Sequence, residues 1–220
     1  LCYDSHMFTK QTHLESIYST GAFLILRLND EEETYQVAKA AIAGGMRALE
    51  VTYSVPGALN LVARLTKEHP DVLIGVGTVM DAPSAFAAYQ AGARLIVSPH
   101  FNPELITVGN RYQCVVASGA FTPSEMVATA EAGADIVKLF PAEAVGPAYL
   151  KAVMAPLAHL PIAPTGAVNP GTVADWFGAG ACAVGVGRYV SGAHRESGNY
   201  DDVSVATQTL LAAIAKARQS

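Results

Sequence analysis

A repeated Ala-Gly pair constrains the fold of this chain more than any other sequence feature. The pair stands at residues 43–44, 91–92, 132–133 and 179–180, so its glycines recur at intervals of 48, 41 and 47 residues. Each pair follows an amphipathic segment and precedes a short apolar run. Because glycine just past a helix readily adopts the left-handed conformation that ends the helix, each pair indicates a helix end followed by a strand.

Each interval is long enough for two strand–helix units, because one unit of a compact barrel needs only about 20–25 residues. Eight apolar runs fit this spacing. They are predicted as strands at Phe23–Arg27, Arg47–Thr52, Val72–Gly77, Leu95–Ser98, Cys114–Ser118, Ile136–Phe140, Pro161–Thr165 and Ala183–Gly187. Strands that alternate with helices form a parallel sheet, and eight such units favour closure into a single α/β (β/α)8 TIM barrel.

Capping residues predict where several helices begin. The predicted helices are a short N-terminal one at Phe8–Tyr18, Glu31–Ile42 after a cap at Asn29 or Asp30, Gly57–Glu68, Asp81 to Gln90, Thr122 to Glu131, Asn169 to Phe177, and Val203–Arg218. Thr122 with Glu125 has the spacing of a capping box. We expect residues 8–220 to form the barrel domain and residues 1–7 to be a cloning remnant or a disordered tail.

The composition argues against several classes of protein. Hydrophobic residues make up 51% of the chain and charged residues 15%, which is typical of a protein with a large core. The net charge is −5 without a basic run, which argues against a nucleic-acid partner. No signal peptide or membrane-spanning run is visible, and Cys2, Cys114 and Cys182 lack disulfide or zinc spacing. We therefore predict a cytoplasmic protein that contacts no membrane.

Strand alternation places three charged side chains inside the predicted barrel. Side chains along a strand point alternately to the helix layer and to the interior. Because their apolar strand neighbours face the helices, Arg27, Glu50 and Lys138 point inward near the C-terminal strand ends, where barrel active sites lie. Burying an unpaired charge costs several kcal/mol or more, so these residues have either a function or a partner. The alternative is a structural ion pair between Lys138 and Glu50.

A lysine in an apolar pocket suits Schiff-base chemistry. Desolvation disfavours its ammonium form and frees a nucleophilic amine that can condense with a ketone. The iminium that results is an electron sink for cleavage of the adjacent carbon–carbon bond. We hypothesise that Lys138 is the nucleophile, Glu50 the proton shuttle and Arg27 the clamp for a substrate carboxylate. This predicts a class I aldolase that acts on a small-molecule 2-keto acid with neither metal nor cofactor.

Glycine-rich turns end the predicted strands seven and eight, at Thr165-Gly166 and at Gly187-Arg188. Turns at these places form the usual phosphate site of barrel enzymes, and an arginine can bind phosphate through two hydrogen bonds. Alternatively, Arg188 is a solvated loop residue. Thr78 follows Gly75-Val76-Gly77, whose glycines either let a ligand approach the backbone or only form a tight turn. The histidines and carboxylates show no metal-ligand spacing.

The sequence around the predicted strand ends resembles the 2-keto-3-deoxy-6-phosphogluconate (KDPG) and 4-hydroxy-2-oxoglutarate (KHG) aldolase family. The similarity covers nearly the whole chain after its leading tail, and its stretches are Ile25–Arg27, Leu49–Thr52, Gly75–Val79, Ile96–His100, Val137–Glu143 and Pro164–Gly166. The resemblance implies a Schiff base at Lys138 and proton transfer by Glu50. It also implies further contacts: Arg27 and Thr78 to the pyruvate-end carboxylate, Thr165, Gly166, Gly187 and Arg188 to phosphate, and Phe140 and Pro99 in the pocket.

The implied reaction is the reversible cleavage of KDPG to pyruvate and glyceraldehyde 3-phosphate, a step of the Entner–Doudoroff pathway, in a homotrimer. The chain departs from the family pattern at Ala167, where glycine is common, and at Arg188, where serine is common. Both departures touch the phosphate contacts. Alternatives are KHG cleavage or oxaloacetate decarboxylation at the same site, a phosphosugar epimerase or thiamin-phosphate-synthase-like barrel, and a non-catalytic barrel that binds phosphorylated metabolites.

Overall fold

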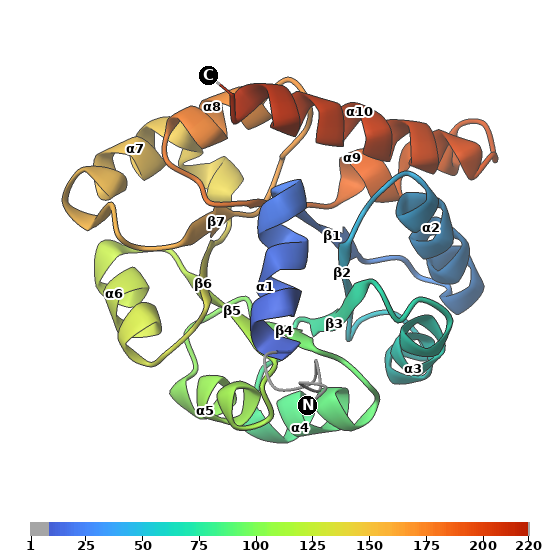
Figure 1. Ribbon diagram of the computed structural model, residues 1–220, viewed down its shortest axis with the longest axis horizontal. Helices are drawn as coiled ribbons and strands as arrows, with labels where there is room; N and C mark the ends of the chain where they lie inside the picture. Colours follow the sequence, from blue (N-terminus) through green and yellow to red (C-terminus); the bar gives the residue numbers. More distant parts are fainter. Residues whose placement is uncertain (1–8, 220) are drawn as a thin grey trace, which may run out of the picture.

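Eight parallel strands close into a barrel in this computed structural model, which describes residues 9–219 (Figure 1). The strands are β1 Ala22–Leu26, β2 Ala48–Thr52, β3 Leu73–Gly77, β4 Leu95–Val97, β5 Val115–Ala120, β6 Ile136–Leu139, β7 Ile162–Pro164 and β8 Val184–Val186. Each strand pairs with the next in sequence from β1 to β7, and β1 also pairs with β8. A bridge between Thr165 and Gly185 joins the β7 and β8 sides. The predicted barrel is confirmed, with strand ends within two residues of the prediction.

Helices surround the strands (Figure 1). They are α1 Thr9–Thr20, α2 Glu31–Ala43, α3 Ala58–Glu68, α4 Ala82–Gln90, α5 Pro103–Arg111, α6 Pro123–Glu131, α7 Gly146–Leu157, α8 Val173–Gly178, α9 Arg188–Ser191 and α10 Asp201–Ala217, with 3-10 turns at Ala142–Ala144 and Ala193–Arg195. The structure confirms the cap at Asp30, whose side chain accepts a hydrogen bond from the Glu33 N–H at 2.8 Å, and the capping box of Thr122 and Glu125.

Four helices differ from the sequence prediction. α5, α7 and the short α9 were not predicted, although Asn102 caps α5 through the Leu105 N–H at 2.9 Å. α8 begins at Val173 rather than near Asn169, because the Asn169 side chain accepts a hydrogen bond from the Gly171 N–H at 2.8 Å. That local bond forms a turn in which the helix does not start.

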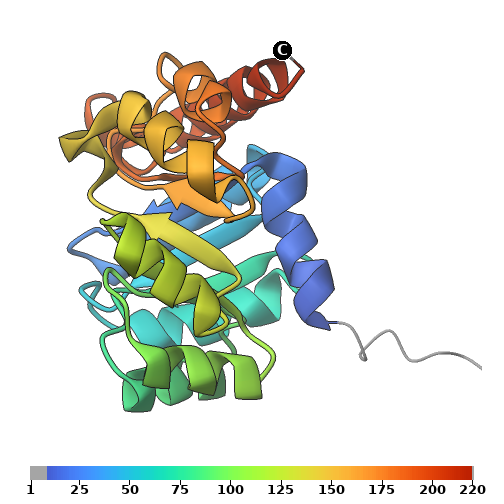
Figure 2. The ribbon, with the colours of Figure 1, turned by 90° about the vertical axis from the view of Figure 1, so that its left-hand side faces the viewer.

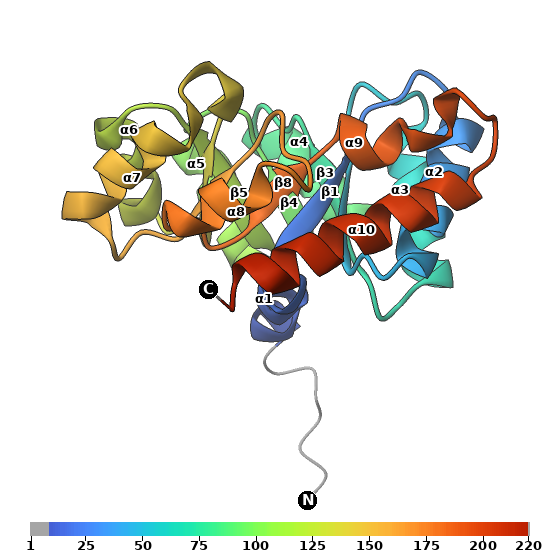
Figure 3. The same cartoon turned by 90° about the horizontal axis from the view of Figure 1, so that it is seen from above.

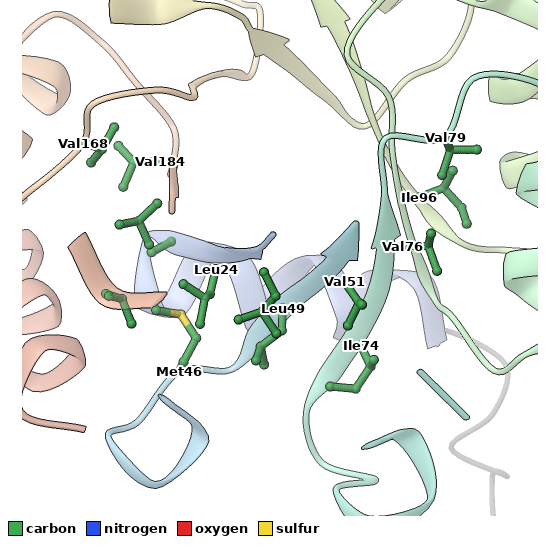
Figure 4. Packing of buried hydrophobic residues seen from close by; sticks show 14 of the residues in the cluster. Leu24, Met46, Leu49, Val51, Ile74, Val76, Val79, Ile96, Val168 and Val184 are labelled. Carbon is green, nitrogen blue, oxygen red and sulfur yellow. The ribbon is translucent and has the colours of Figure 1, made fainter. Parts of the chain in front are cut away.

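The strands bury one apolar layer outside the barrel and another inside it. Figure 4 shows the outer layer, in which Leu24, Leu49 and Val51 lie among the residues between strands and helices. The inner layer is formed by every second residue of each strand, such as Ala48 and Ile136. The predicted inward direction of the neighbouring Glu50 and Lys138 follows from the same alternation.

Helix α1 covers the N-terminal end of the barrel, as Figures 2 and 3 show. Ile17 is completely buried against the inner layer. Lys10 forms an ion pair with Asp135 at 2.8 Å, and the Arg218 guanidinium donates a hydrogen bond of 2.7 Å to the Tyr18 carbonyl. These contacts hold both ends of α1 over the N-terminal end of the barrel.

Two sequence predictions remain at the level of prediction. The expected cloning remnant at residues 1–7 lies outside the described residues, and the domain start at residue 8 stays a prediction. In the described part of the chain, every helix is too short or too polar to cross a membrane.

Candidate active site

Lys138 on β6 and Glu50 on β2 meet inside the barrel. Their side chains are almost completely buried, with 4% and 0% of the residue exposed, and Nζ lies 3.8 Å from Oε1. Neither carboxylate oxygen of Glu50 has a hydrogen-bond partner among the described residues. A separation of 3.8 Å is too long for a hydrogen bond, so this pair lacks the tight geometry that a structural ion pair needs to offset its desolvation.

The neighbouring glycines make room for these groups. A Cβ atom on Gly77 would lie 2.7 Å from Oε1 of Glu50, and one on Gly75 would collide with the backbone of Leu95. The glycines of β3 therefore serve packing inside the barrel wall and leave space for the carboxylate. The close approach of a ligand to this backbone, one of the two interpretations of the sequence, stays a prediction.

Burial shifts the protonation equilibria of both groups toward their neutral forms. Desolvation lowers the pKa of Lys138, the charge of Glu50 opposes this shift, and the charge of Arg27 adds to it. Desolvation raises the pKa of Glu50, against the opposing charges of Lys138 and Arg27. The pair therefore supplies a partly neutral amine beside a carboxyl group that can both give and take a proton.

Arg27 and Thr78 lie together at the C-terminal ends of β1 and β3. The Arg27 guanidinium donates a hydrogen bond of 3.2 Å to the Thr78 hydroxyl. Thr78 has a φ of 59°, a left-handed conformation that costs a β-branched residue on the order of 1–3 kcal/mol. Backbone strain of this kind concentrates at functional sites, and here it accompanies a hydroxyl and a guanidinium beside the lysine.

A cavity of about 960 Å³ opens above Lys138 at this end of the barrel. Its described lining includes these predicted site residues: Arg27, Lys138, Phe140, Thr165, Gly166, Gly187 and Arg188. The Nζ atom of Lys138 lies 5.4 Å from the centre of the Phe140 ring. Glu50 and Thr78 are not in this lining set but contact Lys138 and Arg27, which are.

Pro99, predicted as a pocket residue, is not among the described residues that line the cavity. Its carbonyl packs instead where a Cβ on Gly119 would lie. His100, the residue after it, also lies outside the lining set, and its carbonyl accepts a hydrogen bond of 2.7 Å from the Ser98 hydroxyl. This turn therefore packs against Gly119 of β5.

The turn after β7 has an unusual backbone. Gly166 has a φ of +125°, and a Cβ there would collide with the Glu143 carboxylate. Ala167, one of the two departures from the family pattern described above, has a φ of 52°. Alanine therefore adopts the left-handed conformation that glycine adopts without cost, so the departure from the family pattern changes the side chain while the left-handed turn is kept.

Sequence reasoning missed two charged residues of the cavity, Glu143 and Arg195. Glu143 belongs to the most specific of the family-like stretches, which was a signal that could have been used. Arg195 stands seven residues after Arg188 without any motif, and only the path of α9 and the following 3-10 turn brings it to the cavity.

The described residues show no group of three or more His, Cys, Asp or Glu side chains placed to hold a metal ion. What the site contains is an amine, a carboxyl group and several cations around a deep cavity. This arrangement can form an imine with a ketone and bind anionic groups nearby.

Comparison with known proteins identifies the family. Residues 15–206 match the family model "KDPG and KHG aldolase". The 2-dehydro-3-deoxy-phosphogluconate aldolase of Pseudoalteromonas atlantica is 34% identical over 71% of this chain and 74% of its own length. The solved native KDPGal structure has a TM-score of 0.84 and 28% identity over 90% of this chain and 96% of its own.

A third similar protein was solved with pyruvate bound covalently. The KDPG aldolase of Legionella pneumophila, with pyruvate captured as a covalent carbinolamine intermediate, has a TM-score of 0.79 and 25% identity over 89% of this chain and 96% of its own. Since the family model spans most of the chain and a relative above 30% identity covers more than two thirds of it, the chain belongs to the KDPG and KHG aldolase family of carbon–carbon lyases.

Proposed function

We propose that this protein is a class I aldolase that reversibly cleaves KDPG to pyruvate and glyceraldehyde 3-phosphate through a Schiff base on Lys138. The observation that carries the proposal is the buried amine of Lys138, which lines the cavity 3.8 Å from the carboxyl group of Glu50. The covalent carbinolamine of pyruvate in the Legionella enzyme supports the same chemistry for this chain.

The cleavage begins when the neutral amine of Lys138 attacks the C2 carbonyl of the substrate. Glu50 protonates the hydroxyl of the carbinolamine, which leaves as water and gives the iminium ion. Glu50 then accepts the proton of the C4 hydroxyl while the C3–C4 bond breaks. The electron pair of this bond moves into the iminium to form an enamine, and the C4 fragment leaves as the aldehyde. Protonation of the enamine at C3 and hydrolysis release pyruvate and restore the amine.

Two sets of cavity residues account for binding in this proposal. Arg27 and Thr78 hold the carboxylate next to the ketone, because a guanidinium and a hydroxyl together supply several donors. The turns with Thr165, Gly166, Gly187 and Arg188 receive the phosphate, as turns after strands seven and eight commonly do in barrels. Phe140 forms an apolar wall beside the amine.

The cellular context is part of the same proposal. The family resemblance supports a homotrimer in the cytoplasm and a place in the Entner–Doudoroff pathway. The absence of disulfide spacing among Cys2, Cys114 and Cys182 in the sequence supports a reducing compartment.

A second candidate substrate is 4-hydroxy-2-oxoglutarate, which has a carboxylate where KDPG has the phosphorylated end. Arg188 and Arg195, which follow β8 and line the cavity, suit this substrate as well as KDPG, because a guanidinium can bind either a carboxylate or a phosphate through two hydrogen bonds. The same Lys138 and Glu50 steps would release glyoxylate in place of glyceraldehyde 3-phosphate.

Reductive trapping tests the proposal directly. Borohydride added with pyruvate should reduce the imine and leave Lys138 as a stable secondary amine, which peptide mass analysis locates. Exposed Lys151 should remain unmodified and serves as the internal control. An active preparation in which Lys138 carries no adduct would contradict the proposal.

A further inference from the structure

The segment after β8 brings two arginines to the cavity. Arg188 begins α9, and Arg195 ends the 3-10 turn that follows it, and both line the cavity. Within the described residues, neither guanidinium has a carboxylate within 4.0 Å. Both are therefore available to bind an anion that enters the cavity.

Arginines outnumber carboxylates in the cavity wall. Arg27 lies beside the buried Lys138, and the exposed Arg188 and Arg195 lie on the segment after β8. Glu143 is the single carboxylate among the described lining residues. A cleft lined mostly by one sign of charge attracts ligands of the opposite sign, so the wall favours a substrate with anionic groups at both ends.

A buried histidine holds the backbone of Arg195 in place. His194 is 6% exposed, and its Nε2 lies 3.0 Å from Oε1 of Glu33 on α2. Its ring stacks on Tyr200 with a centroid separation of 4.9 Å, and its carbonyl accepts a hydrogen bond of 2.7 Å from the Gly198 N–H. Because Arg27 lies in the connection between β1 and α2, the contact links the two cationic regions of the cavity.

We infer that Arg195 is a specificity-determining residue for an anionic group at the substrate end far from the ketone, and that the His194–Glu33 contact positions it. This inference rests on the proposed aldolase function and adds residues to it. The anion is a phosphate or a carboxylate, which share their chemistry toward a guanidinium. The buried anchor fixes the backbone at Arg195, so binding has to order only the side chain of this residue.

Substrates that differ only in their far end test the role of Arg195. The Arg195→Ala enzyme should show a KM raised about 10- to 100-fold for KDPG, with kcat nearly unchanged, because a charge-assisted hydrogen bond is lost. The KM for 2-keto-3-deoxygluconate, whose far end is uncharged, should not change. If KM also rises for 4-hydroxy-2-oxoglutarate, Arg195 binds either a phosphate or a carboxylate. If KM rises for KDPG alone, Arg195 binds only the phosphate.

Exposed Arg111 on α5 provides the matched control, since it does not line the cavity. Arg111→Ala should leave all three KM values unchanged. The role of Arg195 is overturned when Arg195→Ala affects the uncharged substrate as much as the anionic ones, or affects none of them.

A double-mutant cycle tests positioning. Glu33→Ala should raise KM for the anionic substrates in the same pattern but less strongly than Arg195→Ala, and Glu33→Gln, which keeps an oxygen acceptor for His194, should restore most of the affinity. In the Arg195→Ala background, Glu33→Ala should add no further loss. An additive loss in the double variant, or an equal loss with Gln, overturns the positioning role.

Pyruvate trapping separates this inference from the function on which it rests. Pyruvate has no far end, so borohydride should label Lys138 equally in the wild type and in Arg195→Ala. Wild-type protein that is not labelled contradicts the aldolase function itself. Normal labelling together with unchanged substrate selectivity in Arg195→Ala contradicts only the inference about Arg195.

Discussion

The two ends of the barrel differ in the side chains that they bury, which are mainly apolar at one end and charged at the other. At the N-terminal end, α1 seals the interior with the fully buried Ile17 and is held by the Lys10–Asp135 ion pair. At the C-terminal end, the buried Lys138 and Glu50 lie under an open cavity, and Thr78 is held at positive φ. The apolar end therefore supplies stability, whereas the charged end lowers stability in return for chemistry.

Replacement of Lys138 at the charged end should have the largest effect, a loss of cleavage without a loss of fold. Lys138→Met keeps the apolar stem but cannot form an imine, so cleavage should fall by more than about 10⁴-fold, as when a covalent nucleophile is removed. Steady-state assays with KDPG measure the loss, and circular dichroism should show an intact barrel. Cleavage at normal speed in this variant would end the Schiff-base account.

Loss of the proton shuttle should have the next largest effect. Glu50→Gln keeps the shape of the side chain but removes its acid–base function, so kcat should fall by about 10²- to 10⁴-fold. KM should change little, because Glu50 lies below the residues that line the cavity. A variant with wild-type kcat would mean that another group moves the protons.

At the opposite end, Ile17→Ala should affect stability and leave chemistry intact. The substitution opens a cavity in the inner layer, which should lower the free energy of unfolding by about 2–4 kcal/mol. Urea denaturation measures the loss, and kcat at a temperature where the variant is folded should equal that of the wild type. A fall in kcat would show that the two ends are coupled.

The pH dependence of stability should separate the ends further. Because burial raises the pKa of Glu50 above its ordinary value, its contribution to stability is fully present below the unfolded-state pKa and is lost as the pH rises through the folded-state pKa. Across that window, the wild type should lose up to about 1.4 kcal/mol per pH unit relative to Glu50→Gln. Urea titrations at a series of pH values measure the difference in the free energy of unfolding between the wild type and Glu50→Gln. If this difference does not change with pH, Glu50 is not the group that causes the pH dependence.

The smallest predicted effect concerns the turn after β7. Ala167→Gly removes a Cβ from a left-handed residue, so the free energy of unfolding should rise by up to about 1 kcal/mol after the entropy of glycine is counted. Thermal denaturation measures the gain, and Ala63→Gly on exposed α3 is the control that should destabilise instead. A loss in both variants would show that Ala167 is unstrained.

Much of the site could be predicted from local patterns. The two-residue period of a strand directs Glu50 and Lys138 inward wherever the strand lies, and the caps at Asp30 and Thr122 act within one turn of helix. Arg195 could not be predicted in this way, because no local pattern marks the path of the chain from α9 to the cavity.

The sequence by itself determined the barrel, the inward direction of the charged residues and the chemistry open to a buried lysine, because strand alternation, capping and desolvation depend on near neighbours. No local pattern could show that Lys138 and Glu50 lie 3.8 Å apart across the barrel, or that Gly77 leaves space for the carboxylate. Nor could it show that Pro99 is not among the described residues that line the cavity. These distances depend on barrel closure, which brings together strands far apart in the chain.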